Sequence, residues 1–475
     1  MSSLHFVSSL VAALRRENRL DRLGVERLQQ RRLARLLRSA MSSPFQAERL
    51  RQVDWSAPSL ERVPSVATWE MMRSFPDTLC GERIELSEVQ QVAAQKTGSI
   101  LVRGRYPVSQ TSGTTGEPAF FLNDARSWDI QRAVVFARTF RDRLAWRHVR
   151  RFLRRRYRMA FVVSGLQSCI STQTCLDGSR QARLFSDIRL FAAEQSVSDI
   201  VRQLNDFQPD YVHGYANLLE LLAYRAEDGD LRIRPEFMSS GSEAFSQSGR
   251  AAVLRAFPGT VLTSQYGATE CTVLGNECRA GNMHVNSDYV VLEAVDESGC
   301  PVPAGVRSHH TLLTSLINRF QPMIRFRLTD SITYWPEACS CGSPLPVITL
   351  EGRSDNIIWL ERGPGDFVVY HPLAFQCQMY QVSGIRQWQV DQQERNRLLI
   401  RYVPAPGADA VQVGRQIQRQ WSGYLGEERL QDIVQIVTQS VSEIPRSSTS
   451  QKARQILTAV GPPAGRGGLP GGGVR

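Results

Sequence analysis

The pattern of hydrophobic and polar positions divides the chain into a helical beginning, a long alternation of strands and helices, and a strand-rich end. Leucines recur at helical spacing through residues 3–40, which predicts one or two amphipathic helices there. Prolines then interrupt the pattern, and further helical segments are predicted over Val63–Phe75 and Leu86–Ala94. We therefore expect residues 1–85 to form the N-terminal helical region of a large domain.

The middle of the chain alternates between apolar runs of strand length and helical patterns. The predicted elements are a helix over Trp128–Arg143, a strand over Met159–Ser164, a helix over Val197–Phe207, a strand over Tyr211–Gly214 and a helix over Asn217–Glu227. Such an alternation is typical of a parallel sheet with crossover helices. It predicts an α/β fold for the large domain.

Two apolar runs in this region lead into polar turns. Phe237–Glu243 turns at Ser-Ser-Gly, and a predicted strand over Val261–Ser264 leads into Gln265–Glu270. Ligands of open α/β sheets bind beyond the carboxyl ends of the strands. We therefore expect a nucleotide near these turns, with Ser242 and Glu243 among its contacts.

The pattern changes again after residue 356. Short predicted strands surround one long predicted helix, Val411–Leu425, and this arrangement indicates a compact α+β domain. Gly and Pro dominate residues 461–475, where we expect a disordered tail.

Composition narrows the classes of protein. The length of 475 residues suggests two or three domains, and no apolar run approaches the length of a spanning helix. Residues 1–14 lack the basic region of a signal peptide, and nine scattered cysteines do not resemble a secreted disulfide framework, so a cytoplasmic location is expected. The net charge is +11, with arginines concentrated at 15–38 and 147–158. No aromatic stacking residues accompany them, so we expect solvated helix faces and no nucleic acid partner.

One loop consists only of glycine and small hydroxylated residues. It contains Thr111, Ser112, Gly113, Thr114, Thr115 and Gly116. Free backbone N–H groups and short hydroxyls in such a loop suit polyphosphate oxygens. A flexible surface turn is the alternative interpretation. The loop lacks the lysine and the spacing of a Walker motif.

This loop resembles the phosphate loop of the adenylate-forming superfamily, which includes acyl- and aryl-CoA ligases and nonribosomal adenylation domains. Ala119 stands where many members have Lys, which is similar to the phenylacetate–CoA ligase branch. Four further motifs of the superfamily follow in the expected order. The segments of this chain that resemble them are Tyr266-Gly-Ala-Thr-Glu270, Met323–Asp330, Gly352–Asn356 and Ile444–Arg454. Together the five motifs span most of residues 105–455.

The resemblance implies how a nucleotide would be held. Tyr266 would stack on adenine, and Gly267 would let the backbone approach the nucleotide. Thr269 would offer its hydroxyl to the α-phosphate, and Glu270 would ligate Mg²⁺, which prefers oxygen ligands. Asp330 would hold the ribose hydroxyls, although an Asp that ends a strand can also cap a helix.

The resemblance also implies a hinge and a mobile catalytic lysine. Arg353 would reach the ribose or a phosphate, and Asp355 would be the pivot between the large and small domains. This gives a core at 86–352, a hinge at 353–356 and a small mobile α+β domain at 357–460. Lys96 and Lys452 are the only lysines in the chain, and every other basic side chain, histidine apart, is an arginine. A lysine at position 452 in so lysine-poor a chain suggests that this position requires the compact charge of an ammonium group.

The activity implied by the resemblance is that of an AMP-forming ligase. Such a ligase uses ATP and Mg²⁺ to convert a carboxylic acid into an acyl-adenylate and transfers the acyl group to a thiol, most often coenzyme A. The similarity to the phenylacetate–CoA ligase branch implies an aryl or arylacetic acid. Candidate acid-lining residues are Tyr106, His213, Tyr215 and Ala244.

Two alternatives stay open. The acceptor can be an acyl carrier protein or an amine, and both the basic segment 147–158 and the N-terminal helices could serve an acidic carrier. Departures from the family pattern at Thr329, Asn356 and Gln451 would fit a catalytically weak nucleotide-binding protein, although the retained Lys452 argues against it. The oligomeric state also stays open, with a homodimer among the options.

A group of cysteines and one histidine has the composition of a metal site. Cys339 and Cys341 form a Cys-x-Cys pair, and Cys278 and His284 lie upstream. Four such ligands would form a closed tetrahedral Zn²⁺ site, and reduced free cysteines are the alternative. Some phenylacetate–CoA ligase relatives carry a similar arrangement. Four protein ligands leave no open position, so the site would be structural.

Overall fold

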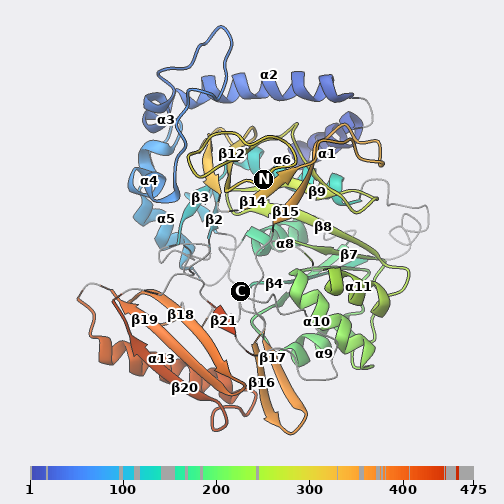
Figure 1. The fold of residues 1–475 in the computed structure, drawn as a ribbon, viewed down its shortest axis with the longest axis vertical. Helices are drawn as coiled ribbons and strands as arrows, with labels where there is room; N and C mark the ends of the chain where they lie inside the picture. The colour runs from blue at the N-terminus through green and yellow to red at the C-terminus, as the bar shows by residue number, and fades with distance from the viewer. Residues whose placement is uncertain are drawn as a thin grey trace.

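The structure, a computed structural model, describes most of the chain between residues 3 and 460. The described residues are 3–17, 20–95, 100–111, 118–140, 156–165, 170–181, 186–241, 245, 247–328, 330–351, 358–370, 375, 378–379, 381–405, 407–442, 444, 456–458 and 460. Figure 1 shows the N-terminal helices and the main sheets together, with the C-terminal sheet beside them.

Helices form much of the N-terminal region, as the leucine spacing predicts. They are α1 (Ser3–Glu17), α2 (Arg22–Ala40), α3 (Pro44–Arg49), α4 (Thr68–Arg73), the 3-10 helix η1 (Phe75–Thr78) and α5 (Leu86–Ala93). Helix α2 begins after Asp21, whose side chain accepts a hydrogen bond of 2.8 Å from the Gly24 backbone N–H. Its buried leucines pack against Leu316 and Ile324, so this helix closes one end of the molecule (Figure 1).

The helix predicted over Val63–Phe75 is wrong in its first part. Val66 instead forms a parallel bridge with Phe326, and its backbone N–H donates to the Arg325 carbonyl over 3.0 Å. The helix therefore begins only at Thr68. A contact between segments so far apart in sequence leaves no trace in local periodicity.

A mixed sheet of nine strands forms the centre of the large domain. Its order is β14-β15-β10-β9-β8-β7-β6-β4-β5. The strands are β4 (Tyr157–Val163), β5 (Ser186–Ala192), β6 (Tyr211–Gly214), β7 (Phe237–Ser240), β8 (Val261–Ala268), β9 (Cys271–Glu277), β10 (Met283–Val285), β14 (Ser331–Tyr334) and β15 (Val347–Glu351). Strands β5, β4, β6, β7 and β8 run parallel, and the remaining pairs are antiparallel.

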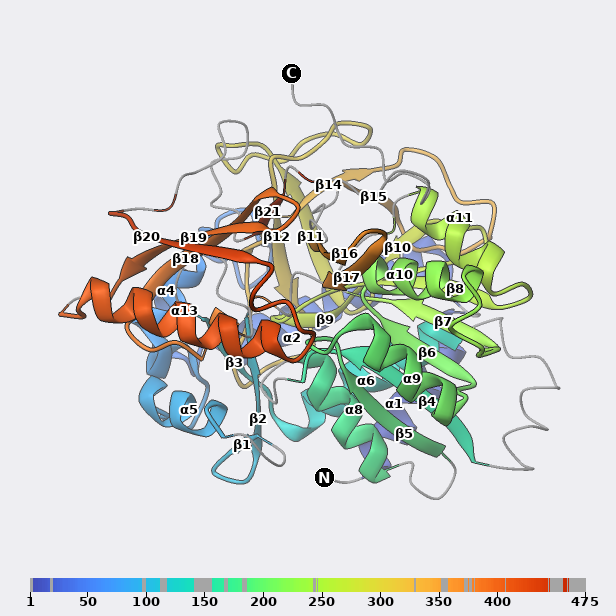
Figure 2. The same ribbon diagram turned by 90° about the horizontal axis from the view of Figure 1, so that it is seen from below.

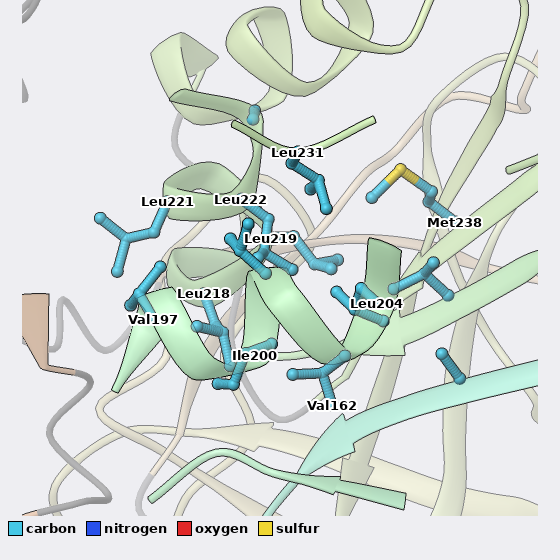
Figure 3. Packing of buried hydrophobic residues seen from close by; sticks show 14 of the residues in the cluster. Val162, Val197, Ile200, Leu204, Leu218, Leu219, Leu221, Leu222, Leu231 and Met238 are labelled. Carbon is cyan, nitrogen blue, oxygen red and sulfur yellow. The ribbon is translucent and has the colours of Figure 1, made fainter. Parts of the chain in front are cut away.

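The helices between the parallel strands are crossover helices, as predicted. They are α8 (Ile170–Gln181), α9 (Val197–Phe207), α10 (Ala216–Glu227) and α11 (Gln247–Ala256), whereas α6 (Ala125–Phe140) precedes the first of these strands. Figure 3 shows leucines of α9 and α10 packed against β4 and β7 residues such as Val162 and Met238. Apolar burial of this kind stabilises the parallel half of the sheet. The predicted α/β fold class is confirmed.

Two smaller sheets complete the large domain. One contains β1 (Leu101–Val102), β2 (Tyr106–Gln110) and β3 (Phe120–Leu122), and the other contains β11 (Val290–Val295), β12 (His310–Ser315) and β13 (Phe326–Leu328). None of the helices in the described ranges has both the length and the hydropathy needed to cross a bilayer.

The C-terminal region forms a separate sheet with one long helix. Strands β18 (Ile385–Glu394), β19 (Arg397–Pro404), β20 (Gln435–Ser440) and β21 (Ile456–Thr458) pair in the order β20-β19-β18-β21, and α13 (Ala410–Gly426) packs on this sheet (Figure 2). A hairpin of β16 (Ile358–Gly363) and β17 (Asp366–Tyr370) precedes it. Ile358 and Leu360 pack with the C-terminal core, whereas Trp359 packs with the core of the nine-stranded sheet.

The C-terminal core should unfold separately from the large sheet, because its hydrophobic cluster contains only residues 358–456. Trp421 in α13 is fully buried beside Phe375, so Trp421→Ala should cost about 3–5 kcal/mol. Hydrogen exchange should then accelerate in β18 and β19 while β6 and β7 keep their protection. The control Val411→Ala lies in the same helix with a 62% exposed side chain and should change stability by less than about 0.5 kcal/mol. Equal acceleration in β6 would contradict a separate core.

Candidate active site

The hydroxyl of Tyr266 and the carboxylate of Asp330 join two motifs that are 64 residues apart. The Tyr266 hydroxyl donates to Oδ2 of Asp330 over 3.1 Å. Tyr266 lies near the end of β8, and Asp330 lies between β13 and β14. Burial, followed by the negative charge of Asp330, raises the pKa of Tyr266 well above its usual value. The phenol therefore keeps its proton and orients this carboxylate oxygen.

A two-residue turn carries Thr269 and Glu270. Strand β8 ends at Ala268 and β9 begins at Cys271, and these two residues are opposite one another in an antiparallel hairpin. The turn predicted over Gln265–Glu270 is therefore wrong for its first four residues, which belong to the strand. The negative charge of Glu270 also contributes to the raised pKa of Tyr266, after burial, Asp330 and Tyr334. Glu270 thus lies within electrostatic reach of the Tyr266–Asp330 pair.

Gly267 is needed for the packing of the hairpin itself. A Cβ at this position would lie 2.8 Å from the carbonyl oxygen and 3.2 Å from the Cα of Thr272 on β9. The ladder between β8 and β9 also shifts register between Tyr266 and Ala268. A glycine at such an irregularity lets two backbones approach closely.

The ends of the candidate phosphate loop are paired with one another. The backbone N–H of Thr111 donates to the Ala119 carbonyl over 2.9 Å, and the Thr111 hydroxyl accepts from the Ala119 N–H over 2.9 Å. These bonds extend the β2–β3 pairing to the base of the loop. The loop residues Ser112, Gly113, Thr114, Thr115 and Gly116 lie outside the described residues.

His213 and Tyr215 lie at the carboxyl end of β6, and each has a buried partner. His213 Nδ1 lies 2.7 Å from the Ser239 hydroxyl, which is also 2.6 Å from the Tyr211 hydroxyl. Burial lowers the pKa of His213 to about 4. The Tyr215 hydroxyl accepts from the backbone N–H of Ser164 over 3.2 Å.

Tyr106 lies in a different part of the large domain. Its ring stacks on Phe320 with centroids 4.1 Å apart, and its hydroxyl donates to Glu82 over 2.5 Å. Its cluster contains β1, β2 and β3 residues and no residue of β6. The structure therefore does not bring Tyr106 into contact with His213 or Tyr215.

The remaining candidates lie outside the described residues. They are Ser242, Glu243, Ala244, Arg353, Asp355 and Lys452. Their proposed roles stay predictions.

Sequence reasoning missed a polar network at the carboxyl end of β4. Glu194 accepts from the Ser164 hydroxyl over 2.6 Å and from the Gly165 N–H over 2.8 Å. The Tyr424 hydroxyl of α13 donates to the Glu194 carbonyl over 2.6 Å, so this network also contacts the C-terminal region. The position of Glu194, directly after a parallel strand, is the signal that could have drawn attention to it.

The four metal-site candidates come together as the sequence predicts. The ligand atoms of Cys278, His284, Cys339 and Cys341 all lie within 4.8 Å of one another. The Sγ atoms of Cys278 and Cys339 are 3.8 Å apart, and Cys341 Sγ is 3.4 Å from His284 Nε2. Zn–S and Zn–N bonds of about 2.3 and 2.0–2.1 Å in tetrahedral geometry give separations close to these.

The surroundings of the cluster also fit a metal-bound form. His284 Nδ1 lies 2.8 Å from the Leu345 carbonyl, so Nδ1 carries the proton and Nε2 is left to bind a metal. Burial opposes ionisation of Cys339, but hydrogen bonds from the Asn282 amide and the Cys341 backbone N–H lower the pKa of its thiol.

No family model and no curated protein matches the chain. Solved structures with a similar fold include 2-hydroxyisobutyryl-CoA ligase in complex with 2-HIB-AMP and CoA in the thioesterification state. It aligns with a TM-score of 0.55 and 19% identity over 90% of this chain and 88% of that chain. The same ligase in the postadenylation state with R3-HIB-AMP aligns with a TM-score of 0.52, 19% identity and the same coverage. Its open conformation aligns with a TM-score of 0.50 and 18% identity over 90% of each chain.

This chain has the adenylate-forming ligase fold. The fold implied by the five motifs is thereby confirmed over nine tenths of the chain. Tyr266, the Thr269–Glu270 turn, His213 and Tyr215 lie near the carboxyl ends of β8 and β6, and Asp330 reaches this region from the segment between β13 and β14 through its hydrogen bond with Tyr266. The phenylacetate–CoA ligase branch stays a prediction.

Replacing Gly267 by Ala should destabilise the hairpin that carries Glu270. The added Cβ would meet the β9 backbone, and forcing such a contact costs about 1–3 kcal/mol. Chemical denaturation measures this loss. Gly423→Ala is the control, because Gly423 lies in helix α13 with open space around its Cβ position, and this substitution should stabilise by up to about 1 kcal/mol. Unchanged stability in Gly267→Ala would show that the two strands separate easily.

Proposed function

We propose that this protein is an AMP-forming ligase that activates a carboxylic acid with ATP and transfers the acyl group to a thiol. The proposed thiol is coenzyme A. The observation that carries this proposal is the hydrogen bond between Tyr266 and Asp330. It brings the second and third motifs together in a fold shared with a ligase solved in complex with 2-HIB-AMP and CoA.

The nucleoside would be held by the same pair. The ring of Tyr266 would stack on adenine, and its hydroxyl fixes one oxygen of Asp330. A carboxylate oriented in this way can accept hydrogen bonds from two neighbouring ribose hydroxyls. Tyr266 therefore has two functions in the proposal, one for its ring and one for its hydroxyl.

The phosphates would lie between the Thr269–Glu270 turn and the loop that begins at Thr111. Loop N–H groups and hydroxyls suit phosphate oxygens, and the carboxylate of Glu270 suits Mg²⁺. Bound Mg²⁺ would neutralise charge on the phosphates. The pairing of Thr111 with Ala119 holds the two ends of the loop together.

The reaction would proceed in two balanced steps. A carboxylate oxygen attacks the α-phosphorus of ATP, the bond to the bridging oxygen breaks, and pyrophosphate leaves an acyl-adenylate. A thiolate then attacks the acyl carbon and expels AMP, with the thiol proton released to solvent. Lys452 would bring positive charge to the first step, and the domain from 357 to 460 would turn about Asp355 before the second.

The acid is proposed to be aryl or arylacetic, with His213 and Tyr215 near its binding site. Both lie at the carboxyl end of β6, where ligands of such sheets bind. The half-buried His213 stays neutral at physiological pH because burial lowers its pKa to about 4. It therefore offers a polar group without a charge.

Pyrophosphate release with Mg-ATP and a panel of aryl, arylacetic and aliphatic acids tests the activity. We expect release that depends on one class of acid and falls about 100-fold or more in Lys452→Ala and in Glu270→Gln, because both remove charge stabilisation of the transition state. Lys96→Ala, at the only other lysine, should keep the wild-type rate.

The acceptor is tested by adding coenzyme A, a phosphopantetheinylated carrier protein or an amine after activation. Product with coenzyme A supports the proposal, and product with the carrier protein or the amine alone corrects the acceptor. Nucleotide binding without release from any acid would contradict the ligase assignment.

We also propose that Cys278, His284, Cys339 and Cys341 bind one structural Zn²⁺. The ligand set and spacing support this proposal. The site would join the segment after β9 to the segment between β14 and β15. A reducing compartment such as the cytoplasm would keep these thiols available.

Metal analysis of the purified protein should find about one zinc per chain, because four ligands fill a tetrahedral site. Cys341→Ser should lose the metal and lower the melting temperature, since metal binding contributes to folding. Cys300→Ser is the control, because Cys300 is exposed and outside the cluster, and it should keep the metal. The zinc-site proposal would be contradicted if the wild-type protein from zinc-supplemented cells contained no metal and its melting temperature did not change when zinc was added.

A further inference from the structure

Three side chains of the neighbouring parallel strands β6 and β7 form a continuous hydrogen-bonded chain, which we call the relay. The Tyr211 and Ser239 hydroxyls are 2.6 Å apart, and the Ser239 hydroxyl is 2.7 Å from His213 Nδ1. Tyr211 and Ser239 are buried, and His213 is half-buried. The β6–β7 register places His213 opposite Ser239, so the sheet itself holds the two side chains together.

The direction of the protons along this chain follows from Tyr211. Within the described structure its hydroxyl makes a hydrogen bond only with Ser239, and burial raises the pKa of Tyr211 to about 12, so the phenol keeps its proton. If Ser239 donated to Tyr211, the phenolic proton would be buried without an acceptor, which is costly. Tyr211 therefore donates to Ser239, and Ser239 donates to Nδ1 of His213.

This direction fixes the tautomer of His213. A neutral imidazole whose Nδ1 accepts a hydrogen bond carries its proton on Nε2. Burial lowers the pKa of His213 to about 4, so the ring is not doubly protonated at neutral pH. The relay thus leaves Nε2–H as a hydrogen-bond donor.

The glycine at residue 241 leaves space beside the Nε2 edge of the ring. A Cβ at Gly241 would lie 3.1 Å from Cε1 and 3.4 Å from Nε2 of His213. Nε2 makes no hydrogen bond to any described residue. The donor lies at the carboxyl edge of parallel strands, where ligands of such sheets bind.

We infer that His213 selects acids that carry a hydrogen-bond acceptor, an ether, carbonyl or hydroxyl oxygen or an aromatic nitrogen, close to the carboxylate. Tyr211 and Ser239 are positioning residues that hold His213 in the Nε2–H form. The inference rests on the proposed ligase activity and adds a specificity determinant to it.

Nitrogen-15 NMR of the histidine-labelled full chain tests the tautomer without any turnover. At neutral pH the resonances that disappear in His213→Gln should show a protonated Nε2 and an unprotonated Nδ1, and they should titrate near pH 4 instead of near pH 6.5. In Ser239→Ala the two tautomers should mix. A protonated Nδ1 in the wild type would overturn the relay.

Pyrophosphate release with matched acids tests the selectivity. Phenoxyacetate has an ether oxygen where 3-phenylpropanoate has a CH₂ group, so the ratio of their kcat/KM values isolates the acceptor. We expect a ratio of about 10 or more in the wild type, because a site built to donate a hydrogen bond rejects analogues without the acceptor. Ser239→Ala should reduce it towards 1, and Tyr211→Phe, which keeps the shape of the ring, should also reduce it.

The matched control is Ser240→Ala. Ser240 is the next residue on β7, equally buried, and its hydroxyl donates to Ser264 over 3.1 Å, away from the relay. It should keep the wild-type ratio. An equal ratio in Ser239→Ala, Tyr211→Phe and the wild type would overturn this inference alone, whereas absence of release from every acid would overturn the ligase assignment together with it.

Discussion

Strand β8 pairs in two directions, and the positions of the candidate site residues depend on this switch. Its first half is parallel to β7, and its second half is antiparallel to β9. The switch places Tyr266, Thr269 and Glu270 beyond the carboxyl ends of the parallel strands. It also starts the antiparallel half of the sheet, in which β10 and its neighbours carry the cysteine–histidine cluster. Close backbone contact at Gly267 lets β9 pair with the second half of β8.

Burial gives the polar groups of the site defined protonation states. Tyr266 and Tyr211 stay protonated because burial raises the pKa of each phenol, and His213 stays neutral because burial lowers the pKa of its imidazole. Each of these groups has a specific hydrogen-bond partner. The candidate site thus presents hydrogen-bonding groups whose protonation and orientation are fixed by the fold.

Elements with strong local signals were predictable from the sequence. The boundaries predicted for α9 and β6 are those of the structure. Helix α9 shows why, because Ser196 caps its first turn and its buried apolar residues recur at helical spacing. Helix α6 begins three residues earlier than predicted, because the Asp124 side chain accepts a hydrogen bond from the Ser127 N–H over 2.7 Å and the prediction overlooked this cap.

Features that depend on distant pairing were not predictable in this way. Gln265 and Tyr266 belong to a strand only because β9 returns beside them, and Val66 is extended only because Phe326 lies next to it. The motifs located Tyr266 and Asp330 separately, but only the fold shows their hydrogen bond. The Tyr211–Ser239–His213 relay was missed for the same reason, since Tyr211 and Ser239 look like ordinary strand residues in sequence.

The central claim is that a carboxylate oxygen attacks the α-phosphorus of ATP in this protein. Its most direct test is to supply the preferred acid with oxygen-18 in its carboxylate, together with Mg-ATP and coenzyme A, and to analyse the products by mass spectrometry. The account predicts that one labelled oxygen appears in AMP and none in pyrophosphate. Label in inorganic phosphate with ADP as the product, or label in no phosphate-containing product, would contradict it.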